Sequence, residues 1–594
     1  MKKSKIRNVA IIAHVDHGKT TLVDQLLKQT GTFRENQQVA IRVMDSMDLE
    51  RERGITIMAK NGSCRYKDHH INIIDTPGHA DFGGEVERVL NMADGALFLV
   101  DAAEGPMPQS FFVLKKAIAR KLPVIVIVNK IDKPMARCDW VVDQVFDLMV
   151  SLNAPDHILD FAVLYACSRD GYASTDMSAR SGDMLPVLDL IIERIPSPVG
   201  DSAGSLQLLV STINYSQYSG RLAIGKITSG KLAVNQEVVV ATDKGHICSG
   251  RIVKLFVYEA TKQVEVASAS TGEIVAVAGL EQIKVGETIT DPANPIPLPW
   301  IPVDPPTLSM NFLPNDSHFA GKEGTFVTSR HIRDRLMRET LSDIALHVED
   351  LTSQPGYKVS GRGELHLAIL IEKMRREGYE FQVSPPSVIY KKSEEGERLE
   401  PYEELTIDVA ENLMGKVIEN LGTRKGQLLE VHQSDAMVRL KYKIPTRGLL
   451  GYQSEFMTDT KGMGILNYVF AEYGPYVGEL LLRKNGVIIA NQTDVTVAYA
   501  LDNLQERGVL FLGPAEHFYA GQIVGEHSRE NDIVVNPAKS KKLTNMRASG
   551  SDDAIILIPP RRMSLEQCIS YIMEGELVEI TPKSIRLRKL KYNN

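Results

Sequence analysis

Apolar and polar positions follow two different patterns along the chain. In the first third, strand-like apolar runs such as "RNVAIIAH", "GALFLVDA" and "LPVIVIVNK" alternate with helix-like segments such as "TTLVDQLLKQ". Strands that are apolar throughout are typically buried on both faces, so with helices between them they predict a mostly parallel sheet. We expect functional residues at the carboxyl ends of these strands, where such sheets bind their ligands.

From about Asp201 the runs become shorter and alternate between apolar and polar positions, as in "LQLLVSTINY" and "GEIVAVAGL". Glycine-bearing turns separate them, and this pattern predicts a small β-barrel. The proline-rich passage "DPANPIPLPWIPVDPPTLSM" that follows predicts an extended, semi-rigid linker.

Two mixed segments follow the linker. In the first, the apolar spacing predicts a helix from Glu364 to Glu377 that stops at Gly378 and leads into a strand. In the second, the pattern predicts strand, helix, strand, strand, helix and strand, the order of a ferredoxin-like domain. The remainder, from about Glu479, is mixed and has basic features of its own.

Length, charge and cysteine content narrow the class of protein. A chain of 594 residues is too long for one core, and roughly four domains are usual for this length. The net charge of -7 excludes a uniformly basic coat but not local basic patches. The five cysteines form no C-x-x-C pair, which favours a reducing compartment and neither a disulfide framework nor zinc. Without a cleavage site or an apolar run that could cross a bilayer, we expect a cytoplasmic protein with no membrane partner.

The stretch "AHVDHGKTT", from Ala13 to Thr21, carries the first candidate chemistry. Its histidines and aspartate allow a metal site, but its end fits the phosphate-binding pattern G-x-x-x-x-G-K-[ST], with Ala13 in place of the first glycine. Such a loop binds phosphate with backbone N–H groups at a helix N-terminus. Lys19 falls at the start of the predicted helix, where a lysine is unfavourable unless an anion binds beside it. We therefore expect Lys19 to neutralise phosphates. The predicted loop residues are His14, Val15, Asp16, His17, Gly18, Lys19, Thr20 and Thr21.

Two further motifs suggest a magnesium ion beside these phosphates. In a switch GTPase, a threonine of the first mobile loop and the threonine of the phosphate loop ligate Mg²⁺, while an aspartate at a strand end holds a metal-bound water. Thr56 of "RGITI", Thr20 and Asp75 of "DTPGH" fit these roles. The N–H of Gly78 would hold the γ-phosphate.

The motif "NKID", which ends another apolar strand, selects the base. The carboxylate of Asp132 can accept from the N1–H and the amine of guanine, whereas adenine offers no matching donors. Such a site rejects the wrong base by a factor of about 10⁴ or more, which disfavours an ATP-dependent enzyme. Asn129 would contact the purine edge, and Lys130 would lie along the ring.

With these motifs in hand, the chain resembles the translational GTPases over essentially its whole length, and most closely the BipA (TypA) family. That superfamily tolerates alanine at the position of Ala13. The resemblance implies Mg²⁺ with GTP or GDP as ligands. It also implies that His79, directly after "DTPG", orients the attacking water, and that Val15 and Ile55 form an apolar gate that holds His79 away from the phosphate.

One motif departs from the family pattern. Where the family has Ser-Ala followed by leucine or lysine, this chain has Cys167, Ser168 and Arg169 in "ACSRDG". The N–H of Ser168 could still bind the guanine carbonyl. Whether Cys167 replaces the side-chain support normally given by serine stays open.

The resemblance also implies a domain order. "GRGELHLAIL" resembles the third domain of elongation factor G, and "TRGLLGYQSEFMTDTKGMG" resembles its last domain, with too few residues between them for the tRNA-mimicking domain of that factor. A translocase role is therefore not expected. The predicted fold is multidomain α/β and β: a GTP-binding P-loop domain at 1–200, a β-barrel at 201–302, two ferredoxin-like α+β domains at 303–392 and 393–478, and a mixed BipA-type domain at 479–594.

The C-terminal segment resembles the BipA domain and not the tail of LepA, and Ser564 with Gln567 predicts a capping box that opens a helix. Two basic clusters predict salt-sensitive contact with RNA phosphates. The candidates are Lys539, Lys541, Lys542, Arg547, Arg561, Arg562, Arg586, Arg588 and Lys589, with Lys583 and Lys591 in the same tail.

The function implied by the resemblance is a ribosome-stimulated GTPase that acts in large-subunit assembly and in translation under stress or cold. Its expected partners are the rRNA and proteins of the large subunit, with ribosome-bound tRNA and guanosine tetraphosphate as further candidates, and we expect a monomer. The alternative is a guanine-nucleotide-sensing RNA-binding module in which hydrolysis is incidental.

Overall fold

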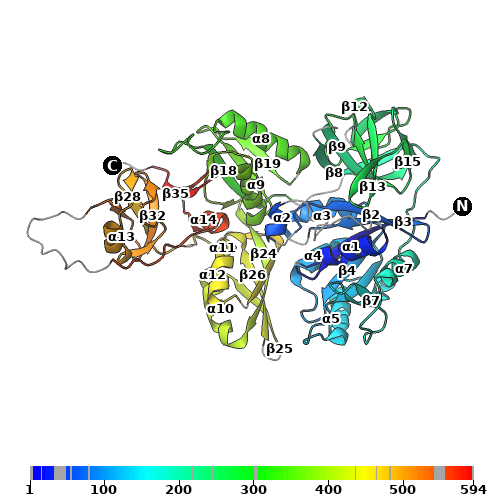
Figure 1. The fold of residues 1–594 in the computed structure, drawn as a ribbon, viewed down its shortest axis with the longest axis horizontal. Helices are drawn as coiled ribbons and strands as arrows, with labels where there is room; N and C mark the ends of the chain where they lie inside the picture. The colour runs from blue at the N-terminus through cyan, green and yellow to red at the C-terminus, as the bar shows by residue number, and fades with distance from the viewer. Residues whose placement is uncertain are drawn as a thin grey trace, which may run out of the picture. The chain divides into compact units, whose positions relative to one another are not determined.

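The computed structural model forms two compact units, residues 1–304 with 341–344 and residues 305–340 with 345–594 (Figure 1). The structure describes residues 5–14, 16–31, 48–53, 56–77, 80–216, 220–242, 245–299, 305–343, 345–434, 437–462, 464–480, 483–540 and 555–591. Within these ranges no helix is long and apolar enough to cross a bilayer.

The first unit opens with a seven-stranded sheet in the order β2-β3-β1-β4-β5-β6-β7. Its five central strands are parallel and its two edge strands antiparallel, so the predicted parallel sheet is confirmed. The strands are β1 (Ile6–Ala13), β2 (Lys60–Tyr66), β3 (His69–Asp75), β4 (Gly95–Asp101), β5 (Val124–Asn129), β6 (Ala162–Cys167) and β7 (Tyr172–Ser174).

Helices follow these strands and cover the sheet (Figure 1). They are α1 (Lys19–Gln29), α2 (Asp48–Arg53), α3 (Gly83–Leu90), α4 (Pro108–Ala119), α5 (Cys138–Ser151), α6 (Asp156–Leu159) and α7 (Leu185–Arg194), with a 3-10 turn at Ala80–Phe82. Apolar side chains of α1 and α7 pack with alternate residues of β1, β3, β4 and β5 in one fully buried core. This core fixes the carboxyl ends of the parallel strands along one edge, where the sequence motifs lie.

An antiparallel β region completes the first unit and encloses a core of its own. Its main sheet has the order β12-β11-β17-β8-β9-β16-β13-β14, and β10 pairs with β15. The strands are β8 (Gln207–Ser216), β9 (Gly220–Ser229), β10 (Lys231–Ala233), β11 (Glu237–Thr242), β12 (Gly245–Arg251), β13 (Lys254–Glu259), β14 (Lys262–Glu265), β15 (Ser268–Ser270), β16 (Ile274–Ala278) and β17 (Thr288–Thr290). Ser63 of β2 and Ala260 exchange backbone hydrogen bonds of 2.8 and 3.0 Å, and Asn8 of β1 donates to Gly272 O at 2.9 Å. The β region is therefore bonded to the strands that carry the nucleotide motifs.

The second unit begins with a ferredoxin-like arrangement whose strands lie in the order β19-β20-β18-β21. Its elements are β18 (Leu308–Pro314), α8 (Ser329–Ser342), β19 (His347–Asp350), β20 (Tyr357–Gly361), α9 (Glu364–Arg376) and β21 (Phe381–Val383), followed by β22 (Ser387–Val388) and β23 (Lys391–Lys392). Helix α9 confirms the helix predicted from Glu364, and Gly378 follows it with φ 95° before the predicted strand.

A second ferredoxin-like arrangement follows, with strand order β25-β26-β24-β27 and all pairs antiparallel. Its elements are β24 (Arg398–Ala410), α10 (Glu411–Thr423), β25 (Gln427–Ser434), β26 (Met437–Pro445), α11 (Thr446–Leu449), α12 (Tyr452–Asp459) and β27 (Ile465–Pro475). The predicted order of strands and helices is confirmed, and the helices pack on one face of the sheet around a separate core.

The C-terminal segment divides between two cores. Its elements are β28 (Val487–Ala490), β29 (Asp494–Val495), α13 (Ala498–Gln505), β30 (Gly508–Leu510), β31 (His517–Phe518), β32 (Gln522–His527), β33 (Ile533–Val535), α14 (Leu565–Tyr571), β34 (Glu576–Ile580) and β35 (Ile585–Lys589). The part up to Val535 contributes to both: Ile488, Ala490 and Val524 belong to a core of its own, whereas Val487 and Ile523 join α14, β34 and β35 in the core of the first ferredoxin-like arrangement. The boundary at 479 stays a prediction.

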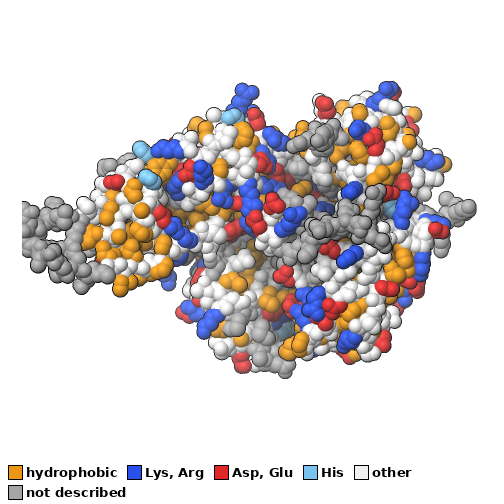
Figure 2. All heavy atoms as spheres, in the orientation of Figure 1, with side chains coloured by type: hydrophobic (Ala, Val, Ile, Leu, Met, Phe, Trp, Pro, Cys, Tyr) orange, Lys and Arg blue, Asp and Glu red, His pale blue; other side chains and the backbone are white. Residues whose placement is uncertain are grey.

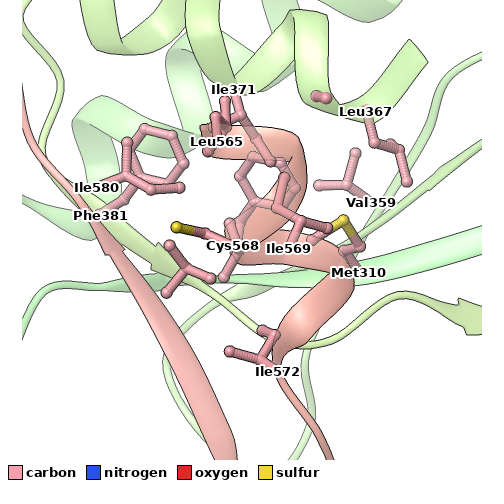
Figure 3. Packing of buried hydrophobic residues seen from close by; sticks show 14 of the residues in the cluster. Met310, Val359, Leu367, Ile371, Phe381, Leu565, Cys568, Ile569, Ile572 and Ile580 are labelled. Atoms are coloured by element: carbon pink, nitrogen blue, oxygen red, sulfur yellow. The ribbon is translucent and has the colours of Figure 1, made fainter. Parts of the chain in front are cut away.

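Helix α14 packs into this shared core. Strand β34 pairs with β21, so one sheet continues into the C-terminal segment. In Figure 3, Leu565 and Ile569 of α14 lie among Ile371 of α9, Val359 of β20 and Met310 of β18. The predicted capping box is confirmed, because Ser564 Oγ accepts from Gln567 N at 3.3 Å while Gln567 Oε1 accepts from Ser564 N at 2.9 Å.

Candidate nucleotide-binding site

The predicted phosphate loop connects β1 to α1 and is held against the end of β5. Gly18 precedes the helix with φ 93°, and a Cβ at this position would lie 2.4 Å from Asn129 Nδ2. Only glycine fits both the backbone conformation and the space. The same Asn129 Nδ2 donates to His17 O at 2.8 Å. The base motif and the phosphate loop are thus joined by a hydrogen bond.

The histidines of this loop do not gather around a metal with Asp16. His17 is fully buried, and its Nδ1 lies 3.3 Å from both Leu99 O and Asp101 N. Its Nε2 lies 3.6 Å from Glu104 Oε2, and the nearby His17 lowers the pKa of the Glu104 carboxyl. Asp16, by contrast, is exposed. His17 is therefore a scaffold residue, as the loop needs its backbone and not its ring.

Lys19, Asp75 and Thr56 meet at one point. Lys19 Nζ lies 2.8 Å from Asp75 Oδ1 and donates to Thr76 O, and both side chains are buried. Thr56 Oγ1 lies 3.5 Å from Asp75 Oδ2. The convergence predicted from three separate motifs is present in the structure, and Lys19 has the partners that its charge requires in a buried place.

The oxygen donors at this point suit a magnesium ion. Mg²⁺ prefers hard oxygen ligands and is usually bound by one or two protein groups together with substrate phosphates. Thr56 and Asp75 supply a hydroxyl and a carboxylate within hydrogen-bond reach of each other, and Thr20 adds a half-buried hydroxyl in the first turn of α1. The residues therefore fit the metal that the fold implies.

At the base end of the site, contacts are made by Asn129, the last residue of β5, and by Lys130, which follows it. Asn129 Oδ1 accepts from Ser168 N at 3.0 Å and from Ser168 Oγ at 2.9 Å. Lys130, with φ 62°, places its Nζ 3.0 Å from Asp101 Oδ2 and donates to Asp16 O. These contacts set the two segments that would flank a purine ring side by side.

Asp132, the carboxylate predicted to recognise guanine, has two partners from "ACSRDG", the motif that departs from the family pattern. Cys167 Sγ donates to Asp132 Oδ1 at 3.2 Å, and Arg169 Nη2 lies 3.1 Å from Asp132 Oδ2. Burial, together with donation to Asp132, raises the pKa of the Cys167 thiol to about 12, so the thiol stays protonated and remains a donor. Cys167 Sγ also lies 3.3 Å from Asp170 Oδ2, so its one S–H can be shared between the two carboxylates. Cys167 thus contacts Asp132, and its role in guanine binding stays a prediction.

Asp101 is a site residue that the sequence analysis missed. This buried carboxylate at the end of β4 accepts from Lys133 at 2.8 Å and from Ala103 N at 2.8 Å, and it lies beside Lys130. Burial alone would raise its pKa, but the hydrogen bonds from Lys133, Ala103 and Lys130 outweigh burial and lower it. An acid that ends an apolar parallel strand was the available signal, because that edge of the sheet holds the ligand.

Several predicted residues lie outside the residues that the structure describes: Val15, Ile55, Gly78, His79, Lys541, Lys542 and Arg547. Of the loop residues that are described, His14 lies edge to face with His17 at a ring distance of 5.2 Å, and Thr21 is exposed on α1.

The described C-terminal cations are mostly tied to carboxylates. On the face in Figure 2, basic and acidic side chains are intermixed. The N···O distances are 2.6 Å for Arg561–Glu526, 3.1 Å for Arg562–Glu516, 2.5 Å for Arg586–Glu323, 2.6 Å for Arg588–Asp316 and 2.7 Å for Lys589–Asp532. Lys539 is exposed. RNA contact by these residues stays a prediction.

Comparisons with known proteins place the chain. Models of three families match it: the elongation factor Tu GTP binding domain at residues 4–285, the elongation factor G C-terminus at 397–484 and the TypA/BipA C-terminal domain at 485–594. A protein of Salmonella typhimurium named large ribosomal subunit assembly factor BipA is 51% identical over 98% of this chain and 96% of its own. The chain belongs to the BipA family. BipA proteins of the same name from Synechocystis, 52% identical over 98% of both chains, and from Bacillus subtilis, 48% identical over 100% and 97%, agree.

A solved structure from Thermus thermophilus shares the fold, with a TM-score of 0.55 and 17% identity over 80% of this chain and 97% of that one. As a BipA family member with a GTP-binding domain and its motifs in place, the protein is a GTPase that binds guanine nucleotides. The predicted resemblance, fold class and enzyme activity are confirmed.

Proposed function

We propose that this GTPase acts in the cytoplasm in the assembly of the large ribosomal subunit. The support is the name that its relatives carry, because these relatives are about half identical to it over nearly their whole length. The observation that carries the nucleotide chemistry is the meeting of Lys19, Asp75 and Thr56 beside a loop clamped by Asn129.

At the phosphate end, the nucleotide replaces internal partners. The backbone N–H groups of the loop and Lys19 bind the phosphates, and Lys19 exchanges Asp75 and Thr76 O for phosphate oxygens. Thr20, Thr56 and Asp75 would hold Mg²⁺, Asp75 through a water, and the N–H of Gly78 would bind the γ-phosphate. Mg²⁺ supplies neutralisation of phosphate charge.

At the base end, Asp132 accepts two hydrogen bonds from guanine, with Cys167 still donating to it. Asn129 binds the purine edge and Lys130 lies along the ring. The N–H of Ser168 already donates to Asn129, so a contact from it to the guanine carbonyl requires that this hydrogen bond be shared. Arg169 is exposed and can leave Asp132 when the base enters.

Hydrolysis is switched by the position of His79. In this proposal His79 orients the attacking water, and Val15 with Ile55 holds it away until the ribosome draws it inward. The free protein then hydrolyses GTP slowly. The proposed partners are the rRNA and proteins of the large subunit, contacted in part by exposed Lys539, and the protein acts as a monomer. Bound tRNA and guanosine tetraphosphate are further proposed ligands.

Complementation of a Bacillus subtilis strain that lacks its BipA tests the assembly role. We expect large-subunit precursors to accumulate in the cold, wild-type protein to restore mature subunits in a sucrose gradient, and the His79→Ala variant to fail. Normal subunit profiles in the deletion strain would contradict the assembly role. Full rescue by His79→Ala would favour the alternative module in which hydrolysis is incidental.

A further inference from the structure

A cavity of about 710 Å³ lies in the second unit, between the first ferredoxin-like arrangement and the C-terminal segment. Four stretches of chain that are distant in sequence form it: Phe319 to Glu323, Phe511 to Ile523, Arg561 to Cys568, and Lys583 to Leu587. Its volume is in the range of small-molecule sites, which is roughly 300–1,000 Å³. None of its lining residues belongs to the nucleotide motifs.

Positive charge dominates the lining. Lys322, Arg561, Arg562, Lys583 and Arg586 face Glu323 and Glu516. Among the residues that the structure describes, Lys322 and Lys583 form no ion pair, and both side chains are exposed. Two ammonium groups at the rim of a concave site focus a positive potential that attracts anions.

The arginines of the cavity are fixed in place. Arg586 pairs with Glu323, Arg562 with Glu516 and Arg561 with Glu526. Arg586 also lies 3.3 Å from Glu579, whereas the printed ion pairs of Arg561 and Arg562 are with one carboxylate each. An arginine held by one carboxylate keeps unused N–H donors, and a fixed guanidinium loses little entropy when it binds a second anion. These pairs therefore pre-organise donors around the cavity.

Aromatic and aliphatic groups complete the lining. Lys322 Nζ lies 4.5 Å and Arg586 Cζ 5.1 Å from the ring centre of Phe319, and Arg561 Cζ lies 5.0 Å from that of Phe511. Ile523 and Leu587 add buried aliphatic surface. A lining with several cations and two phenyl rings suits a ligand that has both phosphates and a planar apolar part.

We propose that this cavity is a second ligand site, which binds a nucleoside polyphosphate that is free in solution. Lys322, Lys583 and Arg562 hold the phosphates, and the base lies against Phe319. The volume suits one nucleotide, whereas an RNA strand would have to continue out of the cavity past the ion pairs. This site goes beyond the GTPase activity and does not depend on it.

Calorimetric titration of the full chain tests the proposal, with the GTP-binding site saturated by GDP so that it takes no second nucleotide. The probes are ATP, inorganic triphosphate and a single-stranded oligoadenylate. We expect ATP to bind below about 1 mM, and more tightly than inorganic triphosphate because only ATP has a base. Failure of ATP to bind, or equal binding of inorganic triphosphate, would overturn the proposal.

The variant Lys322→Glu with Lys583→Glu locates the binding. Both lysines are exposed and form no ion pair with a residue that the structure describes, so the fold and GTP hydrolysis should be unchanged while ATP affinity falls at least tenfold. The matched control is Lys539→Glu, an exposed lysine outside the lining, which should keep the affinity. Unchanged ATP affinity in the double variant would overturn the site, as would binding of oligoadenylate alone that the double variant weakens.

Discussion

The two ends of the chain both carry clustered cations, but the structure gives the clusters different surroundings. In the candidate nucleotide site, Lys19 is held by Asp75 and a backbone carbonyl next to the hydroxyl of Thr56, a set that phosphate and metal would replace in the function we propose. In the C-terminal segment, Arg586 is held by Glu323 and Glu579 on neighbouring strands and loops. We therefore expect the partners of Lys19 to exchange for a ligand and those of Arg586 to stay in place.

The difference shows that a run of basic residues does not by itself indicate a binding surface. Whether such residues can bind a ligand depends on whether carboxylates from other parts of the fold already form ion pairs with them. Most of the described C-terminal candidates have such carboxylates, so contact with RNA phosphates would compete with existing ion pairs. Lys539 is the exposed exception among the described candidates.

The largest expected effect is at the base end. Asp132→Asn removes the acceptor that pairs with guanine donors, so the preference for GTP over ATP should fall by about 10³-fold or more. Competition binding with both nucleotides measures it. Asp147→Asn, an exposed acid on α5, is the control and should keep the preference. If Asp132→Asn kept the preference for GTP, Asp132 would not be the residue that selects guanine, and the alternative of an ATP-dependent enzyme would have to be considered again.

The next effect concerns the C-terminal ion pairs. Arg586→Met leaves Glu579, which is 0% exposed, and Glu323 without their cation, so the free energy of unfolding should fall by about 3–5 kcal/mol. Urea unfolding measures this. Lys583→Met, at an exposed neighbour, should change it by less than about 0.5 kcal/mol. Equal effects of the two variants would remove the distinction between structural and free cations.

The pH dependence of the free energy of unfolding tests the same ion pair between Arg586 and Glu323. Burial would raise the pKa of Glu323, but hydrogen bonds from Thr581 and Arg586 hold it below its ordinary value of 4.5. A lowered folded-state pKa gives stability that is present above pH 4.5 and is lost as the pH falls through and below that value. The Glu323→Gln variant should therefore lose less stability than wild type between pH 5 and pH 3 in urea unfolding. Parallel curves would show that Glu323 carries no such linkage.

The smallest expected effect is on nucleotide affinity, at Cys167 of the "ACSRDG" motif. Cys167→Ser keeps a donor to Asp132, so GDP affinity should stay within about threefold, whereas Cys167→Ala removes the hydrogen bond and should cost about 1 kcal/mol, roughly fivefold. Fluorescent GDP titration compares the two. If serine weakened binding as much as alanine, the thiol would act through packing instead of hydrogen bonding.

The sequence predicted what depends on local pattern. Helix α9 and its end at Gly378, the capping box at Ser564 and the strand order around α10 follow from periodicity and turn residues that lie close together in the chain. Lys19, Asp75 and Asn129 were singled out by short motifs, and the structure brings these motifs together because parallel strands end at one edge.

Long-range pairing was not predictable in the same way. The partners of Arg586 and Arg588, Glu323 and Asp316, lie far earlier in the chain, and their meeting depends on β34 joining the sheet of β21. The inclusion of α14 in the core beside α9 has the same origin, because its apolar face indicates burial but not the partner.

The most direct test of the central claim is the rate of GTP hydrolysis by the purified protein with and without large ribosomal subunits. We predict a slow rate alone, a strong stimulation by the subunits, and loss of only the stimulated rate in His79→Ala. Equal rates with and without subunits would contradict the account.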